Sequence, residues 1–479
     1  MIGLPTASMV GATENPLLRG WRAMLDSLAI LLSSAVAGAA LVAVCFRFGE
    51  AGPVVFFMTA LLPLVTLLLF QQPVLGVLLV FASYPVVALA PWTAELTVDP
   101  VQAAVAVSAG LVVIQRLAVG RGPLDWSGPL WWAVALFAWA LIALPSSSNV
   151  ELGIKQIFAL AGAIVFAAMV LTCCERAWDL RRVLGGLIAV GVLAALFALT
   201  SGVQPEASFG GAVISGRAVG TFNQPNQLGA FAAMVSMVAA GMMLGAESRL
   251  GRILAGVAFA VVFMALILSL SRGAWIGTAL GGLLFVVALP RARRAVLVAA
   301  IPLAVLLAVA GSIAPETPEL QVVGDRLQAF TTENPYDSRP KIWQEARRQV
   351  AADPWTGQGP GNFPVVSARS GSEADTVFAD HAHNLLLNWA AEAGIPAAVL
   401  IVGVVSAVAI AARRARRSAI DREQPRHAAL VVGIAAALIT VMGQGLVDYP
   451  LKNAVIWFTV WGLVGALLAA RRIAGPARA

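Results

Sequence analysis

The sequence predicts an all-α polytopic integral membrane protein with about 12–14 transmembrane helices and one long loop outside the membrane. Of its 479 residues, 59% are hydrophobic and only 12% are charged, and the mean hydropathy is +0.84. Soluble domains carry about 25% charged residues. The apolar residues also occur in long runs, as membrane helices require. The composition therefore excludes a water-soluble globular enzyme.

Fourteen apolar runs are the candidate transmembrane helices. A crossing needs about 20 apolar residues. Several runs are short or closely spaced, so two could be re-entrant or merged. The first run follows Arg19 and Arg22 without a clear small-residue cleavage site, and we expect an uncleaved first helix. The runs are 26–46, 53–70, 74–91, 99–115, 129–145, 155–173, 183–200, 228–246, 251–270, 274–290, 295–313, 385–412, 427–446 and 453–470.

The basic residues predict how the chain is oriented in the bilayer. If each run crosses once, about two thirds of the 32 lysines and arginines fall on the side of the N-terminus. More than half of the others lie in the single segment 314–383. The positive-inside rule therefore predicts cytoplasmic termini and a periplasmic 314–383 segment. Because topology explains the basic clusters, we expect no nucleic-acid partner.

The segment 314–383 is rich in proline, glycine and charged residues and is predicted to be a periplasmic loop with short helices. It contains one amphipathic stretch, Ser338 to Val350, which Pro354 ends. Loops of this length tend to be functional. We therefore divide the chain into a transmembrane helical bundle (1–313), the periplasmic loop (314–383) and the C-terminal transmembrane helices (384–479).

Unusual polar residues collect in the outward loops and form four groups. The groups are Arg217 with Asn223 and Asn226; Ser269 to Gly273, which contains Arg272; Asp380 to Asn384, which contains His381 and His383; and Asp448 to Lys452, which contains Tyr449. Each group also has a structural interpretation. The amides could cap a helix, Arg272 could contact lipid headgroups, and Asp448, Tyr449 and Lys452 could form an interfacial belt with a local ion pair. The two histidines are harder to explain structurally, because the chain has only 3.

These residue types suit a site for a diphosphate and a base. Arginine presents a planar fork that matches phosphate oxygens, so Arg217 and Arg272 are the candidate anion clamp. Histidine titrates near neutrality and can take a proton from a hydroxyl, so His383 and His381 are the candidate catalytic residues. A helix beginning near Asp380 would favour a neutral His383 at its positive end.

Three further polar residues follow the histidines at a spacing of four. Asn384, Asn388 and Glu392 share one helix face, where they could orient the site or join helices.

The sequence predicts no cysteine chemistry. The chain has three cysteines, Cys45, Cys173 and Cys174, and their spacing indicates neither a disulfide framework nor a metal motif.

Several motifs in a fixed order resemble the O-antigen ligase superfamily, which includes bacterial protein O-oligosaccharyltransferases and some O-antigen polymerases. Singly each motif is weak, but together they are specific. They span roughly residues 205 to 455, and residues 1–200 carry no motif that we can place. The motifs are Arg217-x-x-Gly-Thr-Phe-Asn-Gln-Pro-Asn226, Ser271-Arg-Gly273, Arg339-Pro-Lys-Ile-Trp343 followed by Asp353 to Phe363, and His381-Ala-His-Asn384 ahead of Glu392-Ala-Gly394.

The resemblance implies a GT-C-type glycosyltransferase of the bacterial inner membrane, with its active site facing the periplasm. Such an enzyme moves a glycan from undecaprenyl diphosphate to an acceptor hydroxyl, on a lipid A-core sugar or on a serine or threonine of an exported protein. It implies that His383 is catalytic, that Arg272 and Arg217 bind the donor diphosphate, and that neither a cofactor nor a metal is needed. Asp448-Tyr-Pro-Leu and the Asn-Gln-Pro-Asn form look more like the protein-modifying members, whereas the short stretch after Lys452 does not.

Two other functions remain open at the level of sequence. The first is a polymerase, whose acceptor is another lipid-linked glycan. The second is a transporter of lipid-linked glycans, which should place charged residues near the bilayer midplane between broken helices. Here the outward basic residues and histidines lie mainly at one interface, which argues against transport.

Overall fold

The computed structural model describes residues 66–85, 99–200, 207–209, 212–214, 217–289, 293, 338–370 and 379–475. The chain forms two compact units, Met1–Leu75 and Gly76–Ala479. Residues 66–71 of the first unit are helical, and all the site residues belong to the second. The predicted runs 26–46 and 295–313, parts of 53–70 and 74–91, and the last residue of 274–290 lie outside the described residues.

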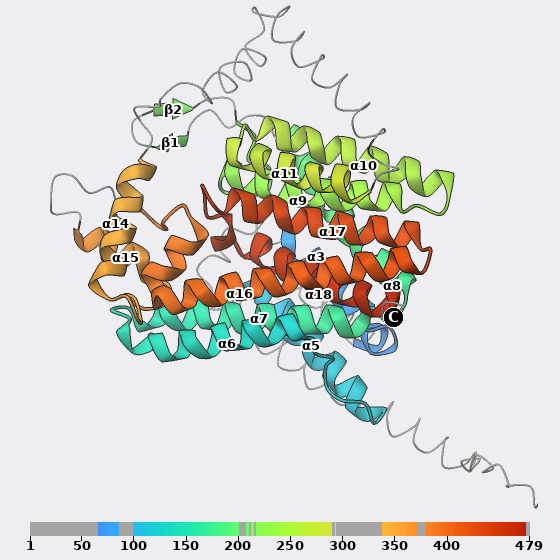
Figure 1. The fold of residues 1–479 in the computed structure, drawn as a ribbon, viewed down its shortest axis with the longest axis horizontal. Helices are drawn as coiled ribbons and strands as arrows, with labels where there is room; N and C mark the ends of the chain where they lie inside the picture. The colour runs from blue at the N-terminus through green and yellow to red at the C-terminus, as the bar shows by residue number, and fades with distance from the viewer. Residues whose placement is uncertain are drawn as a thin grey trace, which may run out of the picture. The chain divides into compact units, whose positions relative to one another are not determined.

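Helices make up most of the described chain (Figure 1). Two short antiparallel strands, β1 (Ala207–Phe209) and β2 (Ala212–Ile214), pair with Ser208 opposite Val213. The helices are α3 (Val74–Ala82), α5 (Pro100–Ala118), α6 (Gly128–Ala143), the 3-10 turn η3 (Leu144–Ser146), α7 (Val150–Cys173), α8 (Ala177–Thr200), α9 (Pro225–Leu244), α10 (Arg249–Leu268), α11 (Arg272–Ala288), α14 (Arg339–Ala352), α15 (Phe363–Ser370), α16 (Leu385–Asp421), α17 (Pro425–Gln444), the 3-10 turn η4 (Pro450–Lys452) and α18 (Ala454–Ala474).

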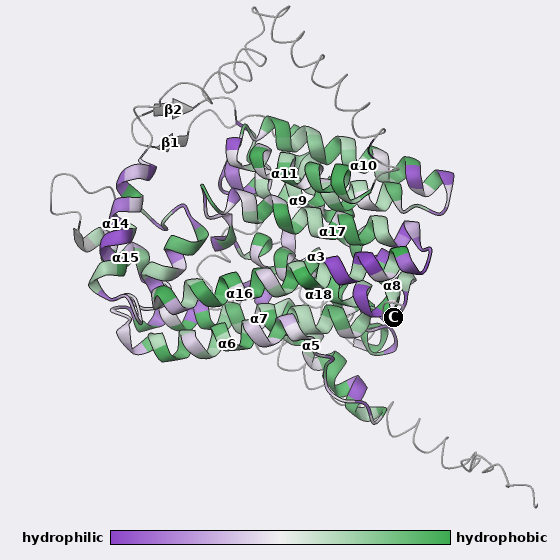
Figure 2. Cartoon of the chain, viewed as in Figure 1, coloured by the Kyte–Doolittle hydropathy of each residue, from purple (hydrophilic) through white to green (hydrophobic). Residues whose placement is uncertain are grey.

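Nine helices in the described part of the chain are long and apolar enough to cross a membrane. They are α5, α6 with η3, α7, α8, α9, α10, α16, α17 and α18, and α11 is a shorter apolar helix. Figure 2 shows apolar residues along these helices, with polar residues concentrated at helix ends and on α14. The predicted class, an all-α polytopic membrane protein, is confirmed. The total of 12–14 crossings stays a prediction, because five candidate runs are wholly or partly outside the described residues.

The centre of the second unit is built on α17 and α18. Both are buried over most of their length, and apolar residues on all sides of a helix are typical of such a position. Helix α17 packs against α9 and α11, α18 packs against α7, and α16 lies against α6, α17 and α18. The peripheral helices α10 and α16 expose a larger share of their apolar residues, as helices that face lipid do.

Polar residues placed just before the apolar stretches begin many of the helices. A side-chain oxygen that accepts a bond from a free backbone N–H stabilises the first turn. Asn149, Ser248, Ser271, Asn384 and Asn453 do this for α7, α10, α11, α16 and α18. Of these caps, Ser271, Asn384 and Asn453 lie within the motif-bearing loops, so the capping interactions fix the geometry of those loops.

Helix α14 is the amphipathic helix that the sequence predicts, and it packs against α16. The turn that follows it closes on an interruption in α16 at Gly394, whose φ is 78°. The backbone N–H groups of Gln358 and Ile395 donate to Ala391 and Pro354 across this contact, at 2.8 Å each. A side chain at position 394 would overlap the carbonyl oxygen of Trp355, so the close approach requires glycine.

Helix α16 begins at the first residue of the apolar run 385–412, but later than the polar group before it suggests. We expected a helix beginning near Asp380, whereas α16 begins at Leu385 with Asn384 as its cap. His383 has a φ of 46°, which is incompatible with an α-helix. Residues 380–383 therefore form an irregular segment in front of the helix, and His383 lies before its first turn.

Candidate active site

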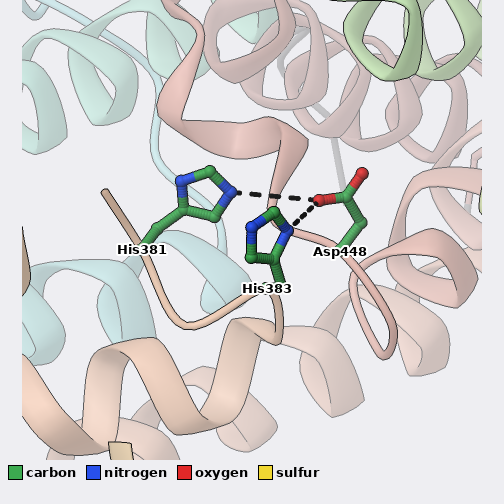
Figure 3. A group of neighbouring side chains, drawn as sticks. All are labelled: His381, His383 and Asp448. Atoms are coloured by element: carbon green, nitrogen blue, oxygen red, sulfur yellow. Dashed lines mark hydrogen bonds and ion pairs between the residues drawn. The ribbon is translucent and has the colours of Figure 1, made fainter. Parts of the chain in front are cut away.

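The centre of the candidate site is a hydrogen bond between His383 and Asp448, which lies between α17 and α18. His383 Nδ1 is 2.8 Å from Asp448 Oδ1. A carboxylate can only accept, so Nδ1 carries the proton and Nε2 keeps its lone pair in the neutral ring. The His383 side chain remains 21% exposed, whereas that of Asp448 is 7% exposed. The pair is thus a buried carboxylate that orients a reachable base (Figure 3).

The segment that carries His383 is attached to the α17–α18 loop by three further hydrogen bonds. Leu385 N donates to Gly445 O at 2.7 Å, Asn384 Nδ2 to Leu446 O at 2.8 Å, and Lys452 Nζ to Asp380 O at 3.1 Å. The positive φ of His383 is a conformation that costs a non-glycine residue free energy. These contacts on both sides of His383 hold its ring against Asp448 despite that cost.

His381 lies beside the pair. Its ring centroid is 4.2 Å from that of His383, and its Nε2 is 3.9 Å from Asp448 Oδ1, beyond hydrogen-bonding distance. The residue is 8% exposed. Burial lowers the pKa of His381, although Asp448 partly offsets this effect. His381 is therefore held as a neutral ring that packs on His383.

Asp448 is the charged centre of the group. It also accepts a hydrogen bond from the backbone N–H of Tyr449, at 2.8 Å. Burial acts to raise the pKa of Asp448, but the two histidines outweigh it and the pKa lies below its usual value. The carboxylate is thus ionised at neutral pH. Burial raises the pKa of Tyr449, whose ring contacts His381 at a centroid distance of 5.8 Å.

Arg217 joins the start of α9 to the end of α10. Its Nε donates to Ser269 O at 2.9 Å and its Nη2 donates to Asn226 Oδ1 at 2.7 Å. The next residue, Ala218, donates its N–H to Leu268 O. Asn226 is therefore a partner of Arg217 and not the cap of α9, which begins with Pro225 at its first position.

Arg272 is the first residue of α11, directly after the capping residue Ser271. The adjacent Gly273 packs on the end of α17, where a Cβ at 273 would lie 3.3 Å from Gln444 Cγ and 3.3 Å from Val447 Cγ2. Val447 directly precedes Asp448 in the chain. The start of α11 is therefore next to the loop that carries Asp448.

The α17–α18 loop connects the arginine groups to the histidine group. Gln444 Nε2 donates to Asn226 O at 3.1 Å, and Asn453 Nδ2 donates to Gln227 Oε1 at 3.2 Å. These contacts fix the start of α9 to both ends of the loop. The structure thus brings Arg217, Asn226, Arg272, His381, His383, Asn384, Asp448 and Tyr449 to the same end of the bundle.

Three predicted residues have other surroundings. Asn223 is exposed and lines a separate cavity of about 280 Å³, together with Phe222 and Phe231. Glu392 is buried and accepts a hydrogen bond from Gln156 Nε2 at 2.9 Å, near the turn that packs on the interruption in α16. Arg339 is the first residue of α14.

Two amides with structural roles in the site were missed by the sequence analysis. Gln444 ends an apolar run, and Asn453 precedes one. Each looks like an ordinary boundary residue. Gln444, however, is fully buried, and a buried amide at the end of a membrane helix is a signal of a specific partner. Asn388, which was noted only for its spacing, accepts a hydrogen bond from Ala382 N at 3.0 Å and so shapes the segment between the histidines.

The comparisons with known proteins agree with the motifs. A search of curated proteins gives no match. Residues 257–402 match a family model described as O-antigen ligase. This segment contains Arg272, Arg339, His381, His383 and Glu392, while Arg217 and Asp448 lie on either side of it. The match confirms the predicted resemblance and supports membership of the chain in the O-antigen ligase superfamily.

Proposed function

We propose that the protein transfers a glycan as one block from undecaprenyl diphosphate to an acceptor hydroxyl, with His383 as the general base. The family match indicates a ligase-like or polymerase-like glycosyl transfer. The observation that carries the finer proposal is the 2.8 Å contact between His383 Nδ1 and Asp448 Oδ1, which leaves Nε2 as the proton acceptor. The carboxylate stabilises the positive charge that the ring gains.

The reaction follows from this arrangement. The acceptor oxygen forms a bond to the anomeric carbon while its proton passes to His383 Nε2. The bond between the anomeric carbon and the diphosphate oxygen breaks, and undecaprenyl diphosphate leaves with both bonding electrons. A single displacement of this kind inverts the configuration at the anomeric carbon. A positioned base contributes about 10²- to 10⁴-fold to such a step.

Arg272 and Arg217 are proposed to stabilise the departing diphosphate. Both belong to elements that pack around the Asp448 loop, as described above. Arginine binds phosphate oxygens with two parallel N–H groups and retains its charge at a membrane surface. Arg217 also holds α9 and α10 together through Asn226 and Ser269, so its removal is expected to disturb the site as well as the charge.

An apolar cavity of about 300 Å³ supports a lipid-linked donor. It lies among α16, α17 and α18, and its lining includes Leu385 and Leu451 near the histidines and Arg413 and Arg416 at the far end. Beyond the interruption at Gly394, the lining follows α16 from Ile401 to Arg416, roughly 22 Å at 1.5 Å per residue. This apolar path suits the prenyl chain of a lipid-linked donor.

The proposed location is the bacterial inner membrane, with the site facing the periplasm and 314–383 above it. The proposed acceptors are a lipid A-core sugar or a serine or threonine of an exported protein. Only the multi-pass character is carried by the helices themselves. The side of the membrane rests on the distribution of basic residues, and the acceptor rests on the resemblance.

The test is transfer by purified protein from a lipid-linked oligosaccharide to a lipid A-core acceptor and, in parallel, to a pilin-like acceptor. We expect His383→Ala to abolish transfer and Asp448→Asn to reduce it by about 10²-fold or more. Asp380→Asn is the matched control, because its exposed carboxylate contacts Lys452 and not the histidines. Unchanged turnover in His383→Ala with a folded protein would rule out this base. Products that remain on the lipid carrier would identify a polymerase.

A further inference from the structure

The three side chains of the histidine group also form a preorganised set of metal ligands. His381, His383 and Asp448 each offer one ligand atom, and these atoms lie within 4.8 Å of one another. Figure 3 shows both rings and the carboxylate converging from two separate loops. The measured separations from Asp448 Oδ1 are 2.8 Å to His383 Nδ1 and 3.9 Å to His381 Nε2.

Two imidazoles and one carboxylate are a ligand set for a divalent transition ion. Zinc binds such groups at about 2.0–2.2 Å in tetrahedral geometry, which places ligand atoms roughly 3.3 Å apart. The two measured separations bracket this value. Shifts of about half an ångström in both rings would bring the two nitrogens to this spacing from the carboxylate oxygen, and a zinc site with three protein ligands leaves the fourth position open to water.

The other ring nitrogen of His381 does not oppose this shift. The side chain is 11% exposed, and Nδ1, which is not the ligand atom, has no hydrogen-bond partner among the described residues. No hydrogen bond through Nδ1 therefore ties the ring to a different orientation. The nearby cation Lys452 is 3.8 Å from Asp380 Oδ2, so a carboxylate compensates its charge.

We propose that His381, His383 and Asp448 bind Zn²⁺ or a similar divalent transition ion, and that the bound ion blocks the base. The ion takes the lone pair of His383 Nδ1, and the ring proton then resides on Nε2. Nε2 becomes a donor and can no longer accept the proton of the acceptor hydroxyl. Asp448 changes from a hydrogen-bond acceptor to a ligand. Binding is independent of the proposed function, whereas inhibition rests on it.

The binding test uses Co²⁺ as a spectroscopic probe and Zn²⁺ in competition with it, on the full chain in detergent. We expect one Co²⁺ per protein, with visible absorption bands of a four-coordinate ion that Zn²⁺ removes. His381→Ala and Asp448→Asn should each weaken binding by about tenfold or more. The control Glu151→Gln removes an exposed carboxylate on α7, outside the ligand set, and should change affinity by no more than about twofold. Absence of binding, or equal affinity in all four proteins, overturns the proposal.

The inhibition test separates this proposal from the proposed function. Zn²⁺ should lower transfer over the same concentration range in which it displaces Co²⁺, and a chelator should restore it. Binding without inhibition overturns the blocking role of the ion. The His383→Ala assay, carried out with a chelator, tests the base without any metal. A metal site that fails therefore leaves the transfer mechanism standing, and the reverse also holds.

Discussion

At the scale of single residues, His383 combines a strained backbone with a fixed ring. Its positive φ turns the chain between Ala382, which is held by Asn388, and Asn384, which caps α16. A residue in a sparsely populated conformation persists only when its surroundings impose it. The surroundings here are hydrogen bonds to the α17–α18 loop. These hydrogen bonds thus hold the strained residue with its ring next to Asp448 and outside the helix that follows.

Arg272 gives the first prediction, because a lipid contact and a diphosphate contact differ in geometry. Arg272→Ala should weaken donor binding by on the order of 10- to 150-fold, since a charge-assisted hydrogen bond is worth roughly 1.5–3 kcal/mol. Arg272→Lys should recover only part of this loss, because lysine keeps the charge but lacks the fork. Binding of undecaprenyl diphosphate to the three proteins measures this.

The control for this series is Arg252→Ala, which removes an exposed arginine near the other end of the helix preceding Arg272. It should leave donor affinity unchanged. Full recovery by lysine, or equal affinities in all the variants, would assign Arg272 to lipid headgroups.

Sequence reasoning found the histidines and arginines but not their partners. His381 and His383 are noticeable because histidine is rare in this chain, and both arginines interrupt apolar surroundings. The contact between His383 and Asp448 joins residues 65 positions apart, and no local pattern encodes such a pairing. Gln444 was missed for the same reason, because its role depends on a contact with Asn226, 218 positions away.

At the scale of elements, the packing of α11 on α17 depends on small residues. A Cβ at Gly277 of α11 would overlap the carbonyl oxygen of Thr440 on α17. Gly443, also on α17, lies against Gly277 as well. Small residues allow close backbone approach between membrane helices. This approach brings the start of α11, and so Arg272, next to the end of α17 and the Asp448 loop.

The second prediction compares two glycines of the same helix. Gly277→Ala should lower the free energy of unfolding by about 1–3 kcal/mol, because the methyl group forces α11 away from α17. Gly282→Ala should be neutral or stabilising, because nothing lies within 4 Å of its Cβ position and alanine favours a helix by about 1 kcal/mol. Thermal unfolding in detergent measures both, and equal midpoints would contradict the close packing.

Helix boundaries illustrate what the pattern of apolar residues can and cannot predict. The run predicted from 385 coincides with the first residue of α16, because Asn384 caps a long apolar stretch. The same run contains Gly394 and Pro396, which permit an interruption, but both residue types are common in apolar membrane helices and do not by themselves predict one. The interruption arises from the turn after α14, which packs on it through Trp355 and Gln358.

At the scale of the second unit, the apolar cavity beside the site gives the third prediction. Val404 lines the cavity, whereas Val402 on the same helix is exposed and is not part of the lining. Val404→Trp should reduce transfer from a donor with a long prenyl chain by about tenfold, because overpacking costs roughly 1–3 kcal/mol. Val402→Trp should leave transfer unchanged.

A donor with a short prenyl chain provides the internal control for this pair. Position 404 lies beyond the interruption at Gly394 and roughly 15 Å further along α16, so a short chain bound at the site does not extend to it. Both tryptophan variants should then transfer from the short donor at the rate of the unsubstituted protein. An equal loss with both donors would place the effect in the fold and not in the cavity.

The final prediction concerns the side of the membrane, and the structure reduces it to a single choice. Three arginines at helix ends donate to backbone carbonyls: Arg181 Nη2 to Gly245 O, Arg472 Nη2 to Cys174 O, and Arg416 Nη2 to Ala288 O. These contacts bring the basic helix ends together with the α7–α8 connection, the α9–α10 connection and the end of α11. The site groups the starts of α9, α11 and α16 with the α17–α18 loop, at the opposite ends of the same helices. The positive-inside rule places the arginine-rich ends in the cytoplasm. A phosphatase fused at residue 420 or 247 should therefore be inactive and one fused at residue 380 active, whereas the opposite result would place the histidines and Asp448 in the cytoplasm, out of reach of a periplasmic acceptor.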